Sequence, residues 1–292
     1  MRPAKFEYFD PHTIGEALNL LENYGEEAKV LAGGLSLVPT MKLRLATPKY
    51  VIDITKIPTL SYAIENNDGG LIIGALTTYQ TLIASPVVQN KCPILVEIAN
   101  GLGGSQVRNR GTLGGNLCQG DPACDFSPAI LALNADLKTV GPKGERIIKA
   151  SDFFIDFFTT SLKPSELLTE IRIPPSLPNT GEAYLKLTQR SGDFAMVSAA
   201  VVMTLDARNI CKTIGVGLGA VAPTPMKAEQ TEKALLGKPV TDELMEEAAK
   251  LATKGTKPSS DIHASSEYRM EMIPVITRRA LKEAFGRAGG AK

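Results

Sequence analysis

The residues of this sequence that are best suited to chemistry lie in two glycine-rich segments. In the first, residues 30–39 read V-L-A-G-G-L-S-L-V-P, so a short apolar run ends in Gly33-Gly34 and the hydroxyl of Ser36 follows. Because these two glycines carry no side chain, backbone N–H groups at the end of a strand can approach a phosphate closely. The Ser36 hydroxyl can donate a hydrogen bond to one of its oxygens. This segment is therefore a candidate phosphate-binding turn.

The second segment, residues 106–116, reads Q-V-R-N-R-G-T-L-G-G-N. It combines a hydroxyl, an amide and glycine backbone within five residues, and such a loop can wrap a diphosphate. Arg108 and Arg110 could neutralise that diphosphate, lie in solvent or contact another subunit. Either segment alone could be a tight structural turn. Their presence in one half of the chain, each flanked by apolar runs, predicts a nucleotide bound between them.

Three other groups of glycines are assigned no ligand. Gly69-Gly70 follows a run of Asn and Asp and predicts a hairpin turn, whereas Gly289-Gly290 belongs to a frayed tail. Residues 215–220 read G-V-G-L-G-A, which matches a form of the dinucleotide-binding fingerprint. That site needs a helix that begins at the glycines, but Pro223 and Pro225 disfavour one. We therefore reject an NAD site there.

Composition narrows the function classes further. The chain has 292 residues, 43% of them apolar and 22% charged, which is typical of a globular protein with one large or two moderate domains. Its net charge of +1 leaves no excess to bind a polyanion, so nucleic acid is not an expected partner. No apolar run has the length of a signal peptide core or a membrane span, and we expect a cytoplasmic protein. The four Cys and two His lack the spacing of a metal site.

Several elements of the first half are predicted from local signals. Thr13 and Glu16 form a capping box for a helix that Gly25 ends. We expect strands at 30–32, 50–54 and 71–76, helices at 77–84 and 93–102, and a hairpin whose strands, 136–140 and 145–148, flank G-P-K-G. Alternating short strands and helices predict an α/β or α+β domain.

A cluster of chain breakers divides the sequence. Pro174, Pro175 and Pro178 stand close to Asn179 and Gly181, which predicts a domain boundary at 176/177. Beyond it, apolar runs at 194–205 and 210–218 predict an antiparallel strand pair. Helices are expected at 228–236, from Thr241 onward and at 266–285. The sequence thus predicts domains at 1–176 and 177–292, the second of them smaller and α+β.

The order of these motifs resembles that of a known protein family. Residues 32–37 read A-G-G-L-S-L, residues 112–116 read T-L-G-G-N and residues 121–125 read D-P-A-C-D. E-I-R-I-P at 170–174, a Tyr-x-Lys at 184–186 and A-V-A-P-T-P at 220–225 follow in the family's order. The chain resembles the FAD-binding medium subunits of molybdenum hydroxylases, the xanthine dehydrogenase and aerobic carbon monoxide dehydrogenase family, over nearly its whole length.

The resemblance implies a fold and a set of cofactor contacts. The fold would be α+β: a two-part FAD-binding domain of the vanillyl-alcohol oxidase-like type, followed by a smaller α+β domain. Asp125 would bond the adenosine ribose and Lys186 would contact the cofactor, while Leu102 and Leu168 would line it. The position after Gly33-Gly34 is often polar in this family, so Leu35 removes a side-chain contact there. The implied FAD-binding residues are Leu31, Ala32, Gly33, Gly34, Leu35, Ser36, Leu37, Leu102, Gly111, Thr112, Gly114, Gly115, Asn116, Asp125, Leu168 and Lys186.

The resemblance also implies an electron-transfer function. Electrons from a molybdopterin centre in a large subunit would pass through [2Fe–2S] clusters in a small subunit to FAD in this chain and then to an external acceptor. The assembly would be a heterotrimer or its dimer, and the substrate would be handled by another polypeptide. This role demands no acid or base, so we assign no catalytic residue.

Two other functions remain open at this point, and one local expectation concerns the thiols. The chain could be a stand-alone FAD-dependent oxidoreductase of the same fold, or an assembly subunit without a cofactor. Cys118 and Cys124 lie beside the second segment, and we expect both to be small buried packing residues.

Overall fold

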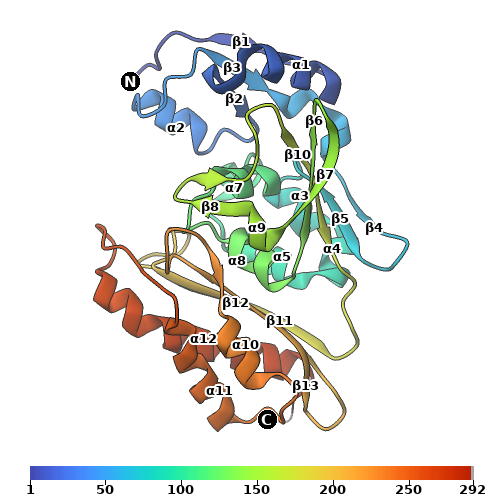
Figure 1. Cartoon of the computed structure of the whole chain (residues 1–292), viewed down its shortest axis with the longest axis vertical. Helices are drawn as coiled ribbons and strands as arrows, with labels where there is room; N and C mark the ends of the chain where they lie inside the picture. The colour runs from blue at the N-terminus through green and yellow to red at the C-terminus, as the bar shows by residue number, and fades with distance from the viewer. Residues whose placement is uncertain (291–292) are drawn as a thin grey trace.

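The computed structural model describes residues 1–290, which form three successive layers of structure along the longest axis (Figure 1). The first is a three-stranded parallel sheet of order β1-β3-β2, built from β1 (Glu7–Phe9), β2 (Ala28–Leu31) and β3 (Tyr50–Asp53). Helix α1 (Ile14–Tyr24) connects β1 to β2, and α2 (Leu37–Lys42) follows β2. The rings of Tyr24 and Tyr50 stack with their centroids 3.9 Å apart, which fixes α1 on this sheet.

The second layer is a five-stranded antiparallel sheet with helices packed on it. Its order is β4-β5-β10-β6-β7, and β8 and β9 form a separate two-stranded hairpin. The strands are β4 (Ala63–Glu65), β5 (Leu71–Gly74), β6 (Asp136–Gly141), β7 (Gly144–Lys149), β8 (Phe154–Asp156), β9 (Thr159–Thr160) and β10 (Leu167–Ile173). The helices are α3 (Tyr79–Ala84), α4 (Pro86–Lys91), α5 (Pro93–Gly101), α6 (Ser105–Arg108), α7 (Leu113–Gln119), α8 (Phe126–Ala132) and α9 (Ala150–Phe153).

The third layer is a four-stranded antiparallel sheet of order β11-β12-β13-β14 with three helices. Alternate residues of β12 point to opposite faces: Ala199 and Val201 join the core under the helices, whereas Ala200 joins the core of the preceding domain. Both faces of this sheet are therefore buried. Its elements are β11 (Thr180–Leu187), β12 (Val197–Leu205), β13 (Cys211–Gly219), β14 (Met226–Lys227), α10 (Glu229–Leu235), α11 (Asp242–Lys250) and α12 (Ser266–Arg287).

The glycines of β13 explain how the first domain covers this sheet. A Cβ on Gly215 would lie 1.9 Å from the carbonyl oxygen of Ala132, and one on Gly217 would lie 1.9 Å from that of Pro128. Helix α8 can pack this closely because β13 presents bare backbone to it. No helix begins at these glycines: the strand continues to Gly219, and the next helix starts at Glu229. The G-V-G-L-G-A run is a helix-packing surface.

The element predictions are confirmed in type, with shifts at some ends. Thr13 caps α1 through its side chain, and the hairpin of β6 and β7 forms around residues 141–144. The helix expected from Thr77 begins at Tyr79, because the Thr78 side chain caps it and the Thr77 hydroxyl is buried and donates to the carbonyl of Tyr62. Within residues 1–290, no helix combines the length and apolar character needed to cross a membrane.

Candidate functional site

The structure brings the two glycine-rich segments into direct contact. Gly33, just after β2, lies against the backbone that leads into α7: a Cβ on Gly33 would be 2.0 Å from the carbonyl oxygen of Arg110. A Cβ on Gly115 would lie 3.6 Å from the Cβ of Ala32. The absence of a side chain at Gly33 therefore allows the turn after β2 and the start of α7 to meet.

The first segment leaves a row of backbone donors free. Among the described residues, no acceptor is bonded to the N–H groups of Gly33, Gly34, Leu35 and Ser36. Gly34 has a φ of +76°, a conformation that favours glycine, and α2 begins at Leu37. Successive free N–H groups in a turn form an anion-binding concavity. The segment has the donors that a diphosphate requires.

The second segment contributes in a different way, because its backbone donors are already used. The N–H of Leu113 donates to the carbonyl of Thr77, and that of Gly114 donates to the carbonyl of Ala75. The N–H of Gly115 donates to the side chain of Thr112, and that of Asn116 donates to the Thr112 carbonyl. A Cβ on Gly114 would lie 2.6 Å from the Cβ and carbonyl oxygen of Ala75. Gly114 is thus required for packing of α7 against the end of β5, and a ligand would meet side chains here.

Asn116 carries the polar atom that the protein itself leaves without a partner. Its Nδ2 donates to the hydroxyl of Tyr79 at 3.3 Å, whereas its Oδ1 is buried and has no hydrogen bond within the described chain. Burial raises the pKa of the Tyr79 hydroxyl, which therefore stays protonated. A buried polar atom without a partner is costly, so Oδ1 is suited to accept a hydrogen bond from a ligand.

Two residues of the C-terminal domain converge on Asp125, which lies just before α8. The hydroxyl of Tyr184 donates to Oδ1 of Asp125 at 2.6 Å, and Nζ of Lys186 lies 2.9 Å from the same oxygen. Lys186 also donates to the carbonyl of Asp193 at 3.0 Å. The Asp125 residue is only 3% exposed, so this is a buried charged contact between the domains. The structure thus brings together Asp125 and Lys186, the two residues expected to contact the cofactor.

The remaining expected residues occupy varied environments. Leu168 is buried in the core of the five-stranded sheet, Leu102 packs against that core, and Leu35 is exposed. Arg110 is exposed, whereas Arg108 donates from Nη1 to the carbonyl of Gly103 at 2.7 Å. Arg108 thereby holds the turn between α5 and α6, in which Gly103 adopts a φ of +47°.

The cysteine expectation is half right. Cys124 is buried, as expected, and its Sγ donates weakly to the carbonyl of Asn116 at 3.6 Å. Burial raises the pKa of the Cys124 thiol well above its ordinary value. Cys118 is exposed, so the prediction that it is buried is wrong. Cys118 follows the fully buried Leu117 on the short helix α7, and successive helical residues point about 100° apart.

Sequence reasoning missed Tyr184 and Tyr79 as members of the site. Tyr184 could have been found, because it stands two residues before Lys186 on one strand and so shares its face. Tyr79 gave no such signal. Its place beside Gly111 depends on the approach of α3 to the second segment, where a Cβ on Gly111 would lie 2.4 Å from the tyrosine ring.

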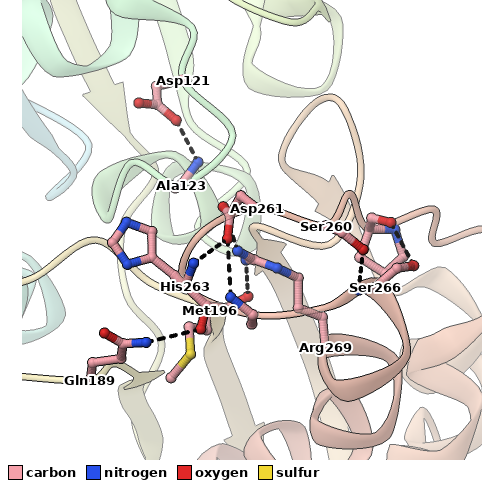
Figure 2. A network of polar contacts seen from close by, with 11 residues as sticks. Asp121, Ala123, Gln189, Met196, Ser260, Asp261, His263, Ser266 and Arg269 are labelled. Atoms are coloured by element: carbon pink, nitrogen blue, oxygen red, sulfur yellow. Dashed lines mark hydrogen bonds and ion pairs between the residues drawn. The ribbon is translucent and has the colours of Figure 1, made fainter.

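A second polar network orders the loop before α12 (Figure 2). Asp261 accepts hydrogen bonds from Nη2 of Arg269 at 2.7 Å and from the N–H of His263 at 2.8 Å. Gln189 donates to the carbonyl of His263 at 3.1 Å, and Arg269 donates to that of Met196. These bonds attach the loop to the β11–β12 connection within the C-terminal domain.

The residues present fit a dinucleotide that contains a flavin. The free donors of residues 33–36 suit the negative charge of a diphosphate, and the unpartnered Oδ1 of Asn116 suits a donor group on the same ligand. Neither feature is used by the fold. The two segments therefore supply groups that suit an anionic ligand with polar edges.

Comparison with known proteins identifies the family of the chain. Residues 4–176 match the family described as FAD binding domain in molybdopterin dehydrogenase, and residues 182–284 match the CO dehydrogenase flavoprotein C-terminal domain. The carbon monoxide dehydrogenase medium chain of Hydrogenophaga pseudoflava is 40% identical over 287 residues, covering 98% of this chain and 99% of the relative. The glyceraldehyde dehydrogenase medium chain of Sulfolobus acidocaldarius is 36% identical over 283 residues, or 97% and 99%.

Solved structures agree over the full length. Carbon monoxide dehydrogenase from Hydrogenophaga pseudoflava contains a chain that matches with a TM-score of 0.96 and 41% identity, covering 98% of this chain and 99% of that one. Quinoline 2-oxidoreductase from Pseudomonas putida gives a TM-score of 0.91 at 30% identity, covering 99% and 100%. The expected fold class is confirmed. The chain belongs to the family of FAD-binding medium subunits of molybdenum hydroxylases, oxidoreductase flavoproteins that transfer electrons within multi-subunit complexes.

Proposed function

We propose that FAD binds where the two glycine-rich segments meet, and that this chain receives electrons there from an iron–sulfur partner. The observation that carries the proposal is the row of free N–H groups at residues 33–36 beside the unpartnered Oδ1 of Asn116. The proposed contacts are Leu31, Ala32, Gly33, Gly34, Leu35, Ser36, Leu37, Leu102, Gly111, Thr112, Gly114, Gly115, Asn116, Asp125, Leu168 and Lys186.

Each part of the site has a separate task in this proposal. The turn at residues 33–36 neutralises the diphosphate through backbone dipoles, and Asn116 orients the ligand through its side-chain amide. Asp125 and Lys186 close the site from the domain boundary, which we place at 176/177. FAD supplies the capacity to accept two electrons and pass them to an external acceptor. The protein residues position it and limit access to it.

The partners in this proposal are two further polypeptides. A small subunit carries [2Fe–2S] clusters and a large subunit carries the molybdopterin cofactor, and together with this chain they form a heterotrimer or its dimer in the cytoplasm. The proposal is supported by the full-length match to medium chains, a class of subunit that works within a larger complex.

A flavin spectrum of the purified full chain tests the cofactor assignment. We expect absorption bands of oxidised flavin, release of FAD on denaturation and a ratio near one FAD per chain. A colourless chain that fails to take up added FAD would contradict the proposal and favour an assembly subunit. Purification under native conditions tests the partners: flavin activity without any iron–sulfur or molybdopterin chain would favour a stand-alone oxidoreductase.

A further inference from the structure

We infer that the iron–sulfur partner docks on an apolar face made by α2 and the β8–β9 hairpin. We call this the docking face and define it by six exposed side chains: Val38, Leu43, Leu45, Ile155, Phe157 and Phe158. In Figure 1, α2 and β8 lie on the same side of the molecule, to the left, and α7 lies between their levels. Clustered exposed apolar side chains mark sites where another molecule binds. The inference rests on the proposed function, because it names the partner of that FAD site.

Both halves of the docking face are attached to the proposed FAD site. Val38 lies four residues after Gly34, and its N–H donates to the Gly34 carbonyl at 3.1 Å. The hairpin packs on the end of α7: the N–H of Phe158 donates to the carbonyl of Gly120, the residue that ends this helix. An electron donor must bring its cluster close to the flavin, and a partner seated across these two elements would cover the segments that hold FAD.

Backbone strain is also concentrated on the docking face. Six described residues other than glycine have a left-handed φ, and three of them are Asn, which tolerates it: Arg44, Asn134, Phe158, Asn179, Asn209 and Ala220. Of the other three, Phe158 belongs to this face, with a φ of 51°, and Arg44, with a φ of 59°, stands between its members Leu43 and Leu45. Strained backbone conformations of this kind are found at functional sites. Here both strained residues, the cationic Arg44 and the aromatic Phe158, have exposed side chains.

The charge of the α2 half indicates what the partner presents to it, whereas the hairpin half carries the exposed carboxylate of Asp156. Residues 28–49 contain four basic side chains and no Asp or Glu. Lys49 pairs with Glu27, whereas Lys42 and Arg44, which flank Leu43, form no ion pair within residues 1–290. A partner surface complementary to the α2 half would combine apolar side chains with carboxylates. Electrostatic attraction of this kind raises association rates and makes them sensitive to salt.

The test compares two double variants with matched controls in the native complex. Leu43→Glu with Leu45→Glu changes the α2 half, and Ile155→Glu with Phe157→Glu changes the hairpin half. The controls are Ile64→Glu and Ile147→Glu, which alter half-exposed apolar residues on β4 and β7, on the other side of Figure 1. A tag on this chain recovers the complex, and the retained [2Fe–2S] absorbance, FAD content and thermal midpoint are measured for each variant.

We expect the two double variants to weaken binding of the iron–sulfur chain at least tenfold, with FAD content kept. The controls should match the wild-type chain. In addition, Lys42→Glu should flatten the dependence of the association rate on salt. Retention of the iron–sulfur chain at control levels would overturn the inference, as would selective loss of the large subunit, of self-association or of vesicle binding. A wild-type chain without flavin would instead refute the proposed function.

Discussion

Lys186 and Asp125 form an ion pair across the domain boundary, with Nζ of the lysine 2.9 Å from Oδ1 of the aspartate. Both side chains are largely buried, and the hydroxyl of Tyr184 donates to the same oxygen. Taking both charges out of water is costly, so the pair depends on its short contacts. The arrangement joins the C-terminal sheet to the start of α8 beside the proposed cofactor site, which makes the pair a test of both stability and binding.

Removing one partner of this pair should destabilise the protein strongly. Lys186→Met leaves the Asp125 carboxylate buried without its cation, and we expect the free energy of unfolding to fall by about 3 kcal/mol. Urea unfolding measures this value. The double variant with Asp125→Asn should lose less than the sum of the single changes. Lys29→Met, at an exposed lysine, serves as the control, and an equal effect of the two lysine substitutions would refute the interpretation.

A methyl group on Gly33 should disturb the site through the protein backbone. Gly33→Ala places a Cβ 2.0 Å from the Arg110 carbonyl oxygen, so the two segments must separate. We expect stability to fall by about 1–3 kcal/mol and FAD content to fall with it. Gly15→Ala is the matched control, because Gly15 lies in α1 with open space around it and should gain up to about 1 kcal/mol. Full FAD content in a folded Gly33→Ala chain would contradict the placement.

Asn116 should affect binding more than stability. Asn116→Leu removes the unpartnered Oδ1 together with one long hydrogen bond to Tyr79, so we expect the free energy of unfolding to change by only about 1 kcal/mol. The affinity for FAD should fall at least tenfold, as measured by flavin fluorescence titration. Asn109→Leu, on an exposed residue of the same segment, should leave affinity unchanged. A large loss of stability with normal FAD affinity would show that Asn116 serves the fold alone.

Glu182 should make stability depend on pH. Its carboxylate, which lies on β11, accepts from the N–H of Ile94 at the start of α5, and burial raises its pKa to about 7. Glu97 raises this pKa further, whereas Arg287 lowers it. Because the folded chain holds a proton that the unfolded chain has lost, stability should decrease as pH rises from about 4.5 to 7, by about 3 kcal/mol in total.

The test is urea unfolding across this pH range for the wild type and Glu182→Gln. The glutamine keeps an acceptor for Ile94 and cannot ionise, so the variant should lose this dependence and be the more stable chain at pH 8. Glu247→Gln, at an exposed position, should keep the wild-type profile. Identical pH profiles for Glu182→Gln and the wild type would exclude this group as the cause.

Local signals account for what could be predicted from the sequence. The caps at Thr13 and Thr241, the β6–β7 hairpin and the two glycine-rich segments each depend on residues close together in the chain. The exposure of Cys118 could not be predicted, because α7 buries only one side and its packing in the fold decides which residues lie on that side. The prolines after the β13 glycines excluded a nucleotide site from the sequence alone, but only the structure shows that these glycines pack against α8.

The sequence by itself determined the order of the elements and which short segments have the chemistry to hold a phosphate. The tertiary structure decided what those segments do with their donors: residues 33–36 keep free N–H groups, whereas the N–H groups of residues 113–116 are used within the fold. It also decided that Lys186 meets Asp125. Hydrogen-bond partners and ion pairs depend on distances between residues far apart in the chain, and only the packing of the two domains sets those distances.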